Sequence, residues 1–338
     1  MTLPPDAYPP AVERLVAEVE PPELRGILTK CLSGSVSPAV ALMQMLIETE
    51  DAPAVRKAVD EVTGRAATLS RASDSILRDR VDDLTQLVVE NAPGCDRIAE
   101  MLRSNMDSPD QAATVEDGIA FCERLFDWSV QQSEEASVAL YSLGNPQLLD
   151  RATGEIIAQL ERWGVISAEH SLLDIGCGIG RLVEELARRA REVSGIDVST
   201  QMINAALRRC APLANVKLLK GTGRDLREFG DAVFDAAIAV DTFPYIRQSG
   251  TALVETYFGE AARVLKPGGH FVILNYSYGG DDEGDANEIA RLAREYEFDV
   301  AVSAERPFTL WDGLAFHLTR RDASRGPAQH RAEASRPS

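Results

Sequence analysis

The sequence has no apolar run of about 18 residues, only five cysteines and no excess of positive charge. A membrane-spanning helix needs about 20 mainly apolar residues, so a membrane span is not expected. The cysteines form no CxxC pair and are odd in number, which argues against a disulfide framework or a zinc site and favours reduced thiols in the cytoplasm. The opening MTLPPDAYPP lacks the basic and apolar regions of a secretory signal.

Acidic charge is plentiful and unevenly placed. The formal net charge is −18, and residues 1–150 hold 26 acidic but only 12 basic side chains. Such a front half repels nucleic acid and anionic lipid, so neither is expected as a partner. The same charge is also typical of an ordinary solvated surface.

Residues 1–135 show the apolar periodicity of helices and no convincing strand. Segments such as SPAVALMQMLIETE and APAVRKAVDEVTGRAATL follow helix-start signals at Ser37-Pro38 and at Asp51. Pro93-Gly94 is predicted to separate two of the helices. No fixed-period repeat is present, so the sequence predicts one small bundle that acts as a cap, a partner-docking module or a homodimerisation module.

From residue 136 onward the pattern changes. Residues 136–164 are predicted to be a linking segment whose amphipathic helix ends at Gly164. Strand-like and helix-like segments then alternate through residues 165–320, which predicts an α/β fold with a mainly parallel sheet between helices. The last two strand segments have no helix between them and are expected to form a hairpin that adds an antiparallel strand. The polar residues 321–338 are predicted to be a disordered tail.

The stretch LLDIGCGIGRL, residues 172–182, places an acid directly before three alternating glycines. A phosphate-binding P-loop would need Lys-Ser or Lys-Thr after the last glycine, but Arg181 stands there. Asp174 would lie close to the pyrophosphate of a dinucleotide and repel it, whereas it suits a cationic group. Asp197 ends the next strand segment, where a carboxylate can accept hydrogen bonds from ribose hydroxyls. An ammonium near Asp174 and a ribose near Asp197 match S-adenosylmethionine.

Residues 165–320 resemble the class I S-adenosylmethionine-dependent methyltransferases through five motifs in order. LLDIGCGIGRL is similar to their first motif, GIDVSTQMINAA to the second and LLKGTGRDL to the third, while FDAAIAVDTFPYI and EAARVLKPGGHFVI resemble the fourth and fifth. The resemblance implies a Rossmann-like, seven-stranded sheet whose last strand is antiparallel. It also implies that S-adenosylmethionine is the cofactor and that no metal is needed.

The resemblance also implies a set of cofactor-binding residues. Asp174, Gly176 and Gly178 are expected at the methionine end, Asp197 at the ribose, and Met202 against the adenine face. Asp241 is expected beneath the methionine portion. The adenine edge is assigned to a segment that has threonine where many family members have an acid. The complete predicted set is Asp174, Gly176, Cys177, Gly178, Gly180, Asp197, Val198, Met202, Thr222, Gly223, Arg224 and Asp241.

The acceptor site is expected in the loops after the fourth and fifth strands and in the segment that covers the cleft. Tyr245, Tyr276 and Tyr278 lie in the former, and Tyr141 lies in the apolar stretch ASVALYSLGNP before the linking helix. A tyrosine can offer its ring face to a cation and its hydroxyl to a polar group, or it can simply pack at an edge. No general base is identified.

The function predicted is methyl transfer to a small-molecule acceptor. The fourth strand is followed by DTFP instead of the [ND]PP[YFW] motif of enzymes that methylate amino groups of nucleobases and glutamine. Two alternatives remain: a catalytically weak or inactive cofactor-binding protein whose helical domain docks a partner, and aminopropyl transfer from a decarboxylated form of the cofactor.

Overall fold

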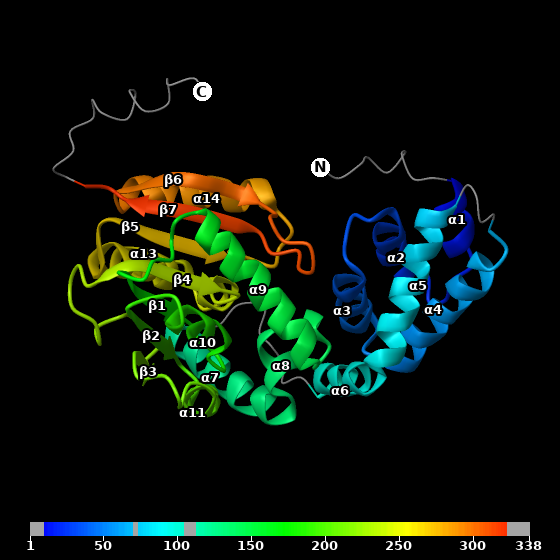
Figure 1. The fold of residues 1–338 in the computed structure, drawn as a ribbon, viewed down its shortest axis with the longest axis horizontal. Coiled ribbons are helices and arrows are strands. Elements are labelled where there is room, and N and C mark those ends of the chain that lie inside the picture. The colour runs from blue at the N-terminus through cyan, green and yellow to red at the C-terminus, as the bar shows by residue number, and fades with distance from the viewer. Residues whose placement is uncertain (1–9, 70–73, 105–112, 323–338) are drawn as a thin grey trace, which may run out of the picture. The chain divides into compact units, whose positions relative to one another are not determined.

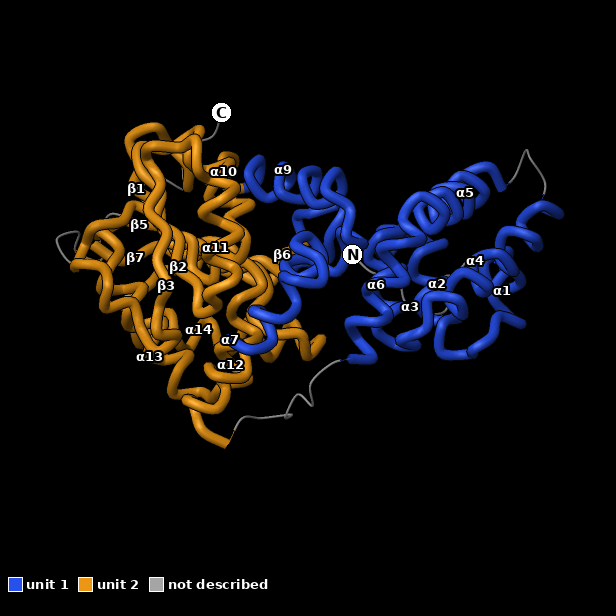
Figure 2. The backbone as a smooth tube through the Cα atoms, turned by 90° about the horizontal axis from the view of Figure 1, so that it is seen from below, with its two compact units in different colours: residues 1–109, 123–159, 307–313 blue, residues 110–122, 160–306, 314–338 orange. Residues whose placement is uncertain are grey.

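The structure is a computed structural model that describes residues 10–69, 74–104 and 113–322. The chain divides into two compact units, coloured separately in Figure 2. Unit 1 comprises Met1–Pro109, Glu123–Gln159 and Pro307–Gly313, and unit 2 comprises Asp110–Cys122, Leu160–Arg306 and Leu314–Ser338. The segment predicted as a disordered tail lies, from residue 323 onward, outside the described residues.

Unit 1 is built from helices, and the described part of residues 1–135 contains no strand. The helices are α1 (Pro10–Val16), α2 (Leu24–Ser33), α3 (Pro38–Thr49), α4 (Ala52–Ala66), α5 (Ser75–Glu90), α6 (Ala92–Arg103), α8 (Glu134–Val138) and the 3-10 turn η2 (Leu140–Ser142). Helix α7 (Val115–Gln132) is divided between the units after Cys122, and α9 (Pro146–Arg162) after Gln159. Among the described residues, no helix has both the length and the apolar character needed to cross a bilayer.

Local start signals explain several of these helices. Ser37 Oγ accepts a hydrogen bond from Val40 N at the start of α3, and Asp51 does the same for Ala54 N at the start of α4. The prediction that Pro93-Gly94 separates two helices is wrong in detail, because α5 ends at Glu90 and Pro93 lies in the first turn of α6. Proline has no N–H to lose there, so the first turn tolerates it.

Unit 2 contains a seven-stranded sheet in the order β3-β2-β1-β4-β5-β7-β6. Its strands are β1 (Ser171–Ile175), β2 (Glu192–Asp197), β3 (Val216–Lys220), β4 (Phe234–Val240), β5 (Leu265–Leu274), β6 (Phe298–Glu305) and β7 (Ala315–Arg320). Strands β1 to β5 pair in parallel, and β7 runs antiparallel to both β5 and β6. The predicted hairpin and antiparallel last strand are therefore confirmed.

Helices connect the parallel strands of unit 2 everywhere except between β3 and β4 (Figure 1). They are α10 (Arg181–Ala187), α11 (Thr200–Arg209), α12 (Phe243–Gln248), α13 (Thr251–Val264) and α14 (Asp282–Glu295). Leu173 and Ile175 of β1 join Phe271 of β5 in a buried cluster with α12, α13 and α14. Because alternate residues of a strand point to opposite faces, this cluster occupies one face of the sheet.

The strand order reverses between β1 and β4. From β1 the chain proceeds outward through β2 to β3, then returns to the other side of β1 as β4. In open α/β sheets, the crevice at the carboxyl ends of the strands next to such a reversal is where ligands bind. Asp174 lies near the carboxyl end of β1, and Asp241 directly follows β4.

Candidate functional site

The glycine turn after β1 depends on backbone angles that favour glycine. Gly176, Gly178 and Gly180 have φ values of 72°, 51° and 76°, in the left-handed region where a side chain is costly. The amides of Gly176 and Cys177 donate to Ile196 O at 2.8 and 3.0 Å, which ties the turn to the end of β2. Cys177 is itself buried, so its thiol is a small filler beneath the turn.

Gly176 is also a point of close approach. A Cβ built there would lie 2.2 Å from Thr242 Oγ1, and that hydroxyl donates to Ile175 O at 2.8 Å. The turn after β1 and the segment after β4 therefore touch through Gly176.

We expect Gly176→Ala to lower the free energy of unfolding by about 3 kcal/mol, because it adds backbone strain to a steric clash. Gly268→Ala is the matched control, since Gly268 has φ 78° but open space around its Cβ position, and about 1 kcal/mol is expected there. Denaturant unfolding of both variants measures the difference. Equal losses would show that the Thr242 contact does not matter.

Asp174 is a buried carboxyl with an unsatisfied oxygen. It is 2% exposed, and its Oδ2 has no hydrogen-bond partner among the described residues. Burial raises the pKa of Asp174 to about 7, against the opposing effect of Arg181. A buried carboxylate oxygen that lacks a donor is costly, so this position is suited to a cationic or hydrogen-bonding ligand group.

Asp197 joins the end of β2 to the glycine turn. Its Oδ2 accepts a hydrogen bond from Gly178 N at 2.9 Å, and its Oδ1 accepts one from Ser199 N at 2.8 Å. Both carboxylate oxygens are thereby oriented by the backbone. A carboxylate oriented in this way is the kind of acceptor that ribose hydroxyls bind.

The residues predicted near adenine lie on two neighbouring segments. Met202 is 1% exposed in α11, whereas Val198 is half-buried. Thr222 is exposed, and its Oγ1 accepts from Arg224 N at 3.2 Å. Gly223 has φ 76°, and a Cβ there would lie 3.3 Å from Val198 Cγ2, which brings the two segments together.

The first turns of α7 reach the same place, which the sequence analysis missed. Ile119 Cγ2 lies 2.9 Å from the Cβ position of Gly223, and Glu116 pairs with Arg224 at 3.4 Å. Cys122 is close enough to Asp197 for the carboxylate to contribute, after burial, to raising the pKa of its thiol to about 11. No motif marks these residues, since their contribution depends on packing alone.

A polar cluster lies beyond β4 and β5. Asp241 Oδ1 accepts from Asn275 Nδ2 at 2.8 Å and from the Tyr278 hydroxyl at 3.1 Å. Asp241 and Asn275 have φ values of 54° and 62°, and such strained residues concentrate at ligand-binding sites. The rings of Tyr245 and Tyr278 meet edge to face with centroids 6.1 Å apart. Tyr278 is 60% exposed and available to a ligand.

The other two tyrosines occupy different environments. Tyr276 is fully buried and stacks on Phe243 with ring centroids 5.8 Å apart. This environment agrees with the alternative in which the tyrosine only packs and does not contact the acceptor. Tyr141 belongs to unit 1, where it is buried and stacks on Trp311 at 5.6 Å. The roles of both in acceptor binding stay predictions.

Comparison with known protein families supports the interpretation of the five motifs as those of a methyltransferase. Residues 173–273 match the model of a family described as "Methyltransferase domain". These residues lie within unit 2, and the match supports the class I S-adenosylmethionine-dependent methyltransferase domain that the motifs imply. S-adenosylmethionine is the cofactor of this class, and the seven-stranded sheet described above is the Rossmann-like fold expected from the sequence.

Individual relatives resemble only part of the chain. A demethylmenaquinone methyltransferase of Tropheryma whipplei is 34% identical over 113 residues, which are 33% of this chain and 44% of that protein. A ubiquinone biosynthesis O-methyltransferase of Alkalilimnicola ehrlichii is 31% identical over 102 residues, 30% of this chain and 39% of that protein. This chain thus matches less than half the length of either methyltransferase.

Among solved structures, the phosphoethanolamine N-methyltransferase 1 of Haemonchus contortus is similar with a TM-score of 0.49 and 18% identity. The likeness covers 62% of this chain and 50% of that one.

Proposed function

We propose that this protein transfers a methyl group from S-adenosylmethionine to a small-molecule acceptor. One observation carries the proposal. At the reversal of strand order, the buried Asp174 and the Asp197 carboxylate flank a glycine turn that has no lysine for a phosphate. Two acids at this turn favour a ligand with a cationic end and a ribose over a nucleotide phosphate.

The described residues fit such a ligand. The unpartnered Asp174 Oδ2 offers an acceptor to the ammonium group, and Asp197 offers acceptors to the ribose hydroxyls. Met202 and Val198 supply apolar contacts for the adenine ring, and the segment from Thr222 to Arg224 borders its edge. The bare backbone at Gly178 lets the ligand approach closely, whereas the space beside Gly176 is filled by Thr242. Cys177 and Gly180 complete the turn.

Methyl transfer is an in-line displacement for which the bound sulfonium supplies an already activated carbon. The protein's contribution is to align the acceptor with that carbon and to exclude water. Asp241, held by Asn275 and Tyr278, lies where the methionine portion and the acceptor are expected to meet. Tyr245 and the exposed Tyr278 are then the acceptor contacts best supported by position.

A small-molecule acceptor is supported by composition and by relatives. The acidic front half disfavours nucleic acid, and the names of two relatives refer to demethylmenaquinone and to ubiquinone biosynthesis. Because each match covers less than half of the relative, the acceptor of this protein stays at the level of a chemical class. A cytoplasmic location and a homodimer formed through the helical region also remain proposals.

The direct test is a label-transfer experiment. The full-length protein is incubated with methyl-labelled S-adenosylmethionine and fractionated cell extract, and label is counted in small-molecule, protein and nucleic-acid pools. We expect label in the small-molecule pool, absent with Asp197→Ala.

Each other result has a distinct meaning. Label in a macromolecular pool would overturn the acceptor class but keep the reaction. No label in any pool, with cofactor binding intact by calorimetry, would favour the cofactor-binding protein without turnover. Transfer only from the decarboxylated cofactor would indicate aminopropyl transfer.

A further inference from the structure

The loop between β3 and β4, residues 221–233, has neither helix nor strand. It nevertheless carries the segment from Thr222 to Arg224 that the proposed function places at the adenine edge. A loop without a backbone ladder must be held by other bonds if it is to present a defined edge to a ligand.

Two anchors hold the ends of this segment. On one side, Gly221 N donates to Asp197 O at 2.9 Å. On the other, Leu226 N donates to Glu260 Oε2 at 2.8 Å, and Leu226 O accepts from Arg263 Nη2 at 3.0 Å. Only the four residues 222–225 lie between the two fixed points, so little backbone freedom remains there.

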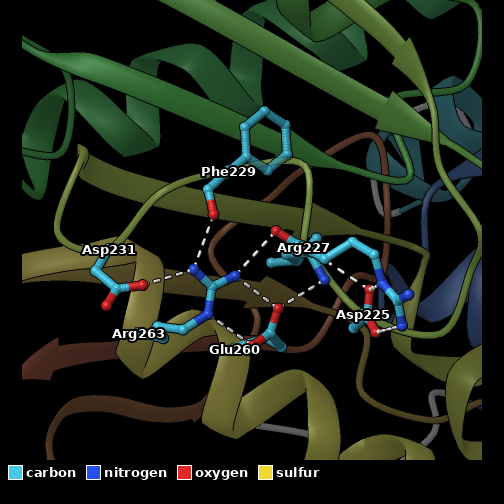
Figure 3. Close-up of polar contacts among 7 residues, drawn as sticks. Asp225, Arg227, Phe229, Asp231, Glu260 and Arg263 are labelled. Atoms are coloured by element: carbon cyan, nitrogen blue, oxygen red, sulfur yellow. Dashed lines mark hydrogen bonds and ion pairs between the residues drawn. The ribbon is translucent and has the colours of Figure 1, made fainter.

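Arg263 of α13 uses its whole guanidinium group in this arrangement (Figure 3). Nε and Nη2 donate to the two carboxylate oxygens of Glu260 at 2.8 and 2.7 Å. Nη1 donates to Phe229 O and to Asp231 Oδ1, both at 2.8 Å. The planar guanidinium group thus donates to three residues of the loop, Leu226, Phe229 and Asp231. Glu260 fixes the orientation of the guanidinium group, and lysine cannot reproduce this geometry.

The neighbouring acid of the loop is already engaged. Asp225 receives Arg227 Nε at 2.8 Å and Nη2 at 2.5 Å as a bidentate pair (Figure 3). This pairing turns the Asp225 carboxylate toward Arg227, which leaves the base edge to the backbone and side chains of residues 222–224.

We propose that Glu260 and Arg263 are positioning residues that set the selectivity of the cofactor site for adenine by fixing the loop from Leu226 to Asp231. The inference rests on the proposed function, since it concerns the same cofactor site. Neither residue needs to touch the ligand. Their effect passes through the Leu226 end of the segment 222–225, so it concerns the base and not the acceptor.

The test compares two ligands on the full-length protein by titration calorimetry. One is S-adenosylhomocysteine, and the other is its analogue with hypoxanthine in place of adenine. We expect the wild type to prefer adenine by about tenfold, which corresponds to one hydrogen bond at the base edge. Arg263→Met should weaken S-adenosylhomocysteine by about tenfold and bring the ratio of the two dissociation constants close to one. The ratio for Arg263→Lys should lie between those of the wild type and Arg263→Met.

Arg291→Met is the matched control, because Arg291 of α14 pairs with Glu255 of α13 without touching the loop. It should leave the ratio unchanged. A merely structural loss would weaken both ligands equally and leave the ratio intact, which would overturn the proposal. If Arg263→Met fails to fold, Glu260→Gln provides the same comparison. A wild-type ratio near one would also contradict the proposal, whereas a wild type that binds neither ligand would contradict the proposed function.

Discussion

Replacing Asp197 with alanine is expected to weaken S-adenosylmethionine binding by about hundredfold or more. Two hydrogen bonds from ribose hydroxyls to a charged acceptor are lost, at about 1.5 kcal/mol or more each, and every 1.4 kcal/mol is a factor of about ten. The turn also loosens, since Gly178 N and Ser199 N lose their acceptor. Calorimetry with S-adenosylhomocysteine measures the effect.

Two controls make this result specific. Asp197→Asn keeps one carbonyl acceptor, so its loss should be smaller, about tenfold. Glu192→Ala removes an exposed acid from the opposite end of the same strand, β2, and should not change the affinity. An affinity that survives Asp197→Ala would remove the ribose contact from the proposed site.

The second large effect concerns the pH dependence of stability and binding through Asp174. Burial raises the pKa of this carboxyl to about 7 in the ligand-free folded protein, from an ordinary value of 3.8. The protonated form is therefore favoured by folding. The stability linked to this group is complete below pH 3.8 and is lost as the pH rises through about 7, a change of a few kcal/mol on the scale of about 1.4 kcal/mol per pKa unit.

Asp174→Asn removes this titration while it preserves the size of the side chain. At pH 8 the ligand-free variant should be more stable than the wild type by a few kcal/mol, and at pH 4 the difference should nearly vanish. Urea unfolding at both pH values measures this, with Glu192→Gln as the control at an exposed acid. A stability difference that does not depend on pH would contradict the buried, neutral carboxyl.

Ligand binding should show the opposite trend. An ammonium beside Asp174 favours the ionised carboxylate, so binding below pH 7 releases a proton. The affinity for the cofactor therefore rises with increasing pH, by up to about tenfold per pH unit. The rise should end near neutral pH, because an α-amino group begins to lose its own proton near pH 8. The Asp174→Asn variant should bind the cofactor more weakly, and its affinity should not rise with pH in this range.

Local patterns in the sequence were sufficient for much of the fold. Each of the seven strands of the sheet was recognisable as an apolar segment bounded by turn residues, and the helix-free connection before β7 predicted its antiparallel direction. Helix α2 was missed, although Leu24, Leu28, Cys31 and Leu32 are buried with helical spacing. Its pattern is short, and an exposed Gly26 interrupts it.

The positions of the glycine turn and of its two neighbouring acids were also predictable, because they depend on residues close together in the chain. A glycine turn requires glycines wherever it occurs, and an acid at the end of β1 or β2 lies at the carboxyl edge of any parallel sheet. The placement of Asp174, the turn and Asp197 at this edge therefore followed from the sequence, whereas their contacts with a cofactor stay predictions. Burial of Asp174 did not follow from the sequence, since it depends on what packs around β1.

Only the tertiary structure decided what depends on contacts between distant segments. Tyr276 and Tyr278 are two residues apart, yet one is fully buried and the other 60% exposed, because both follow the end of β5 at Leu274 and the alternation of a strand no longer applies. Arg263 and Glu260 read as ordinary surface charges of an amphipathic helix until they are seen to hold the loop after β3. Sequence periodicity determines which face of an element is apolar, whereas the partner of a polar side chain is set by which segments the fold brings together.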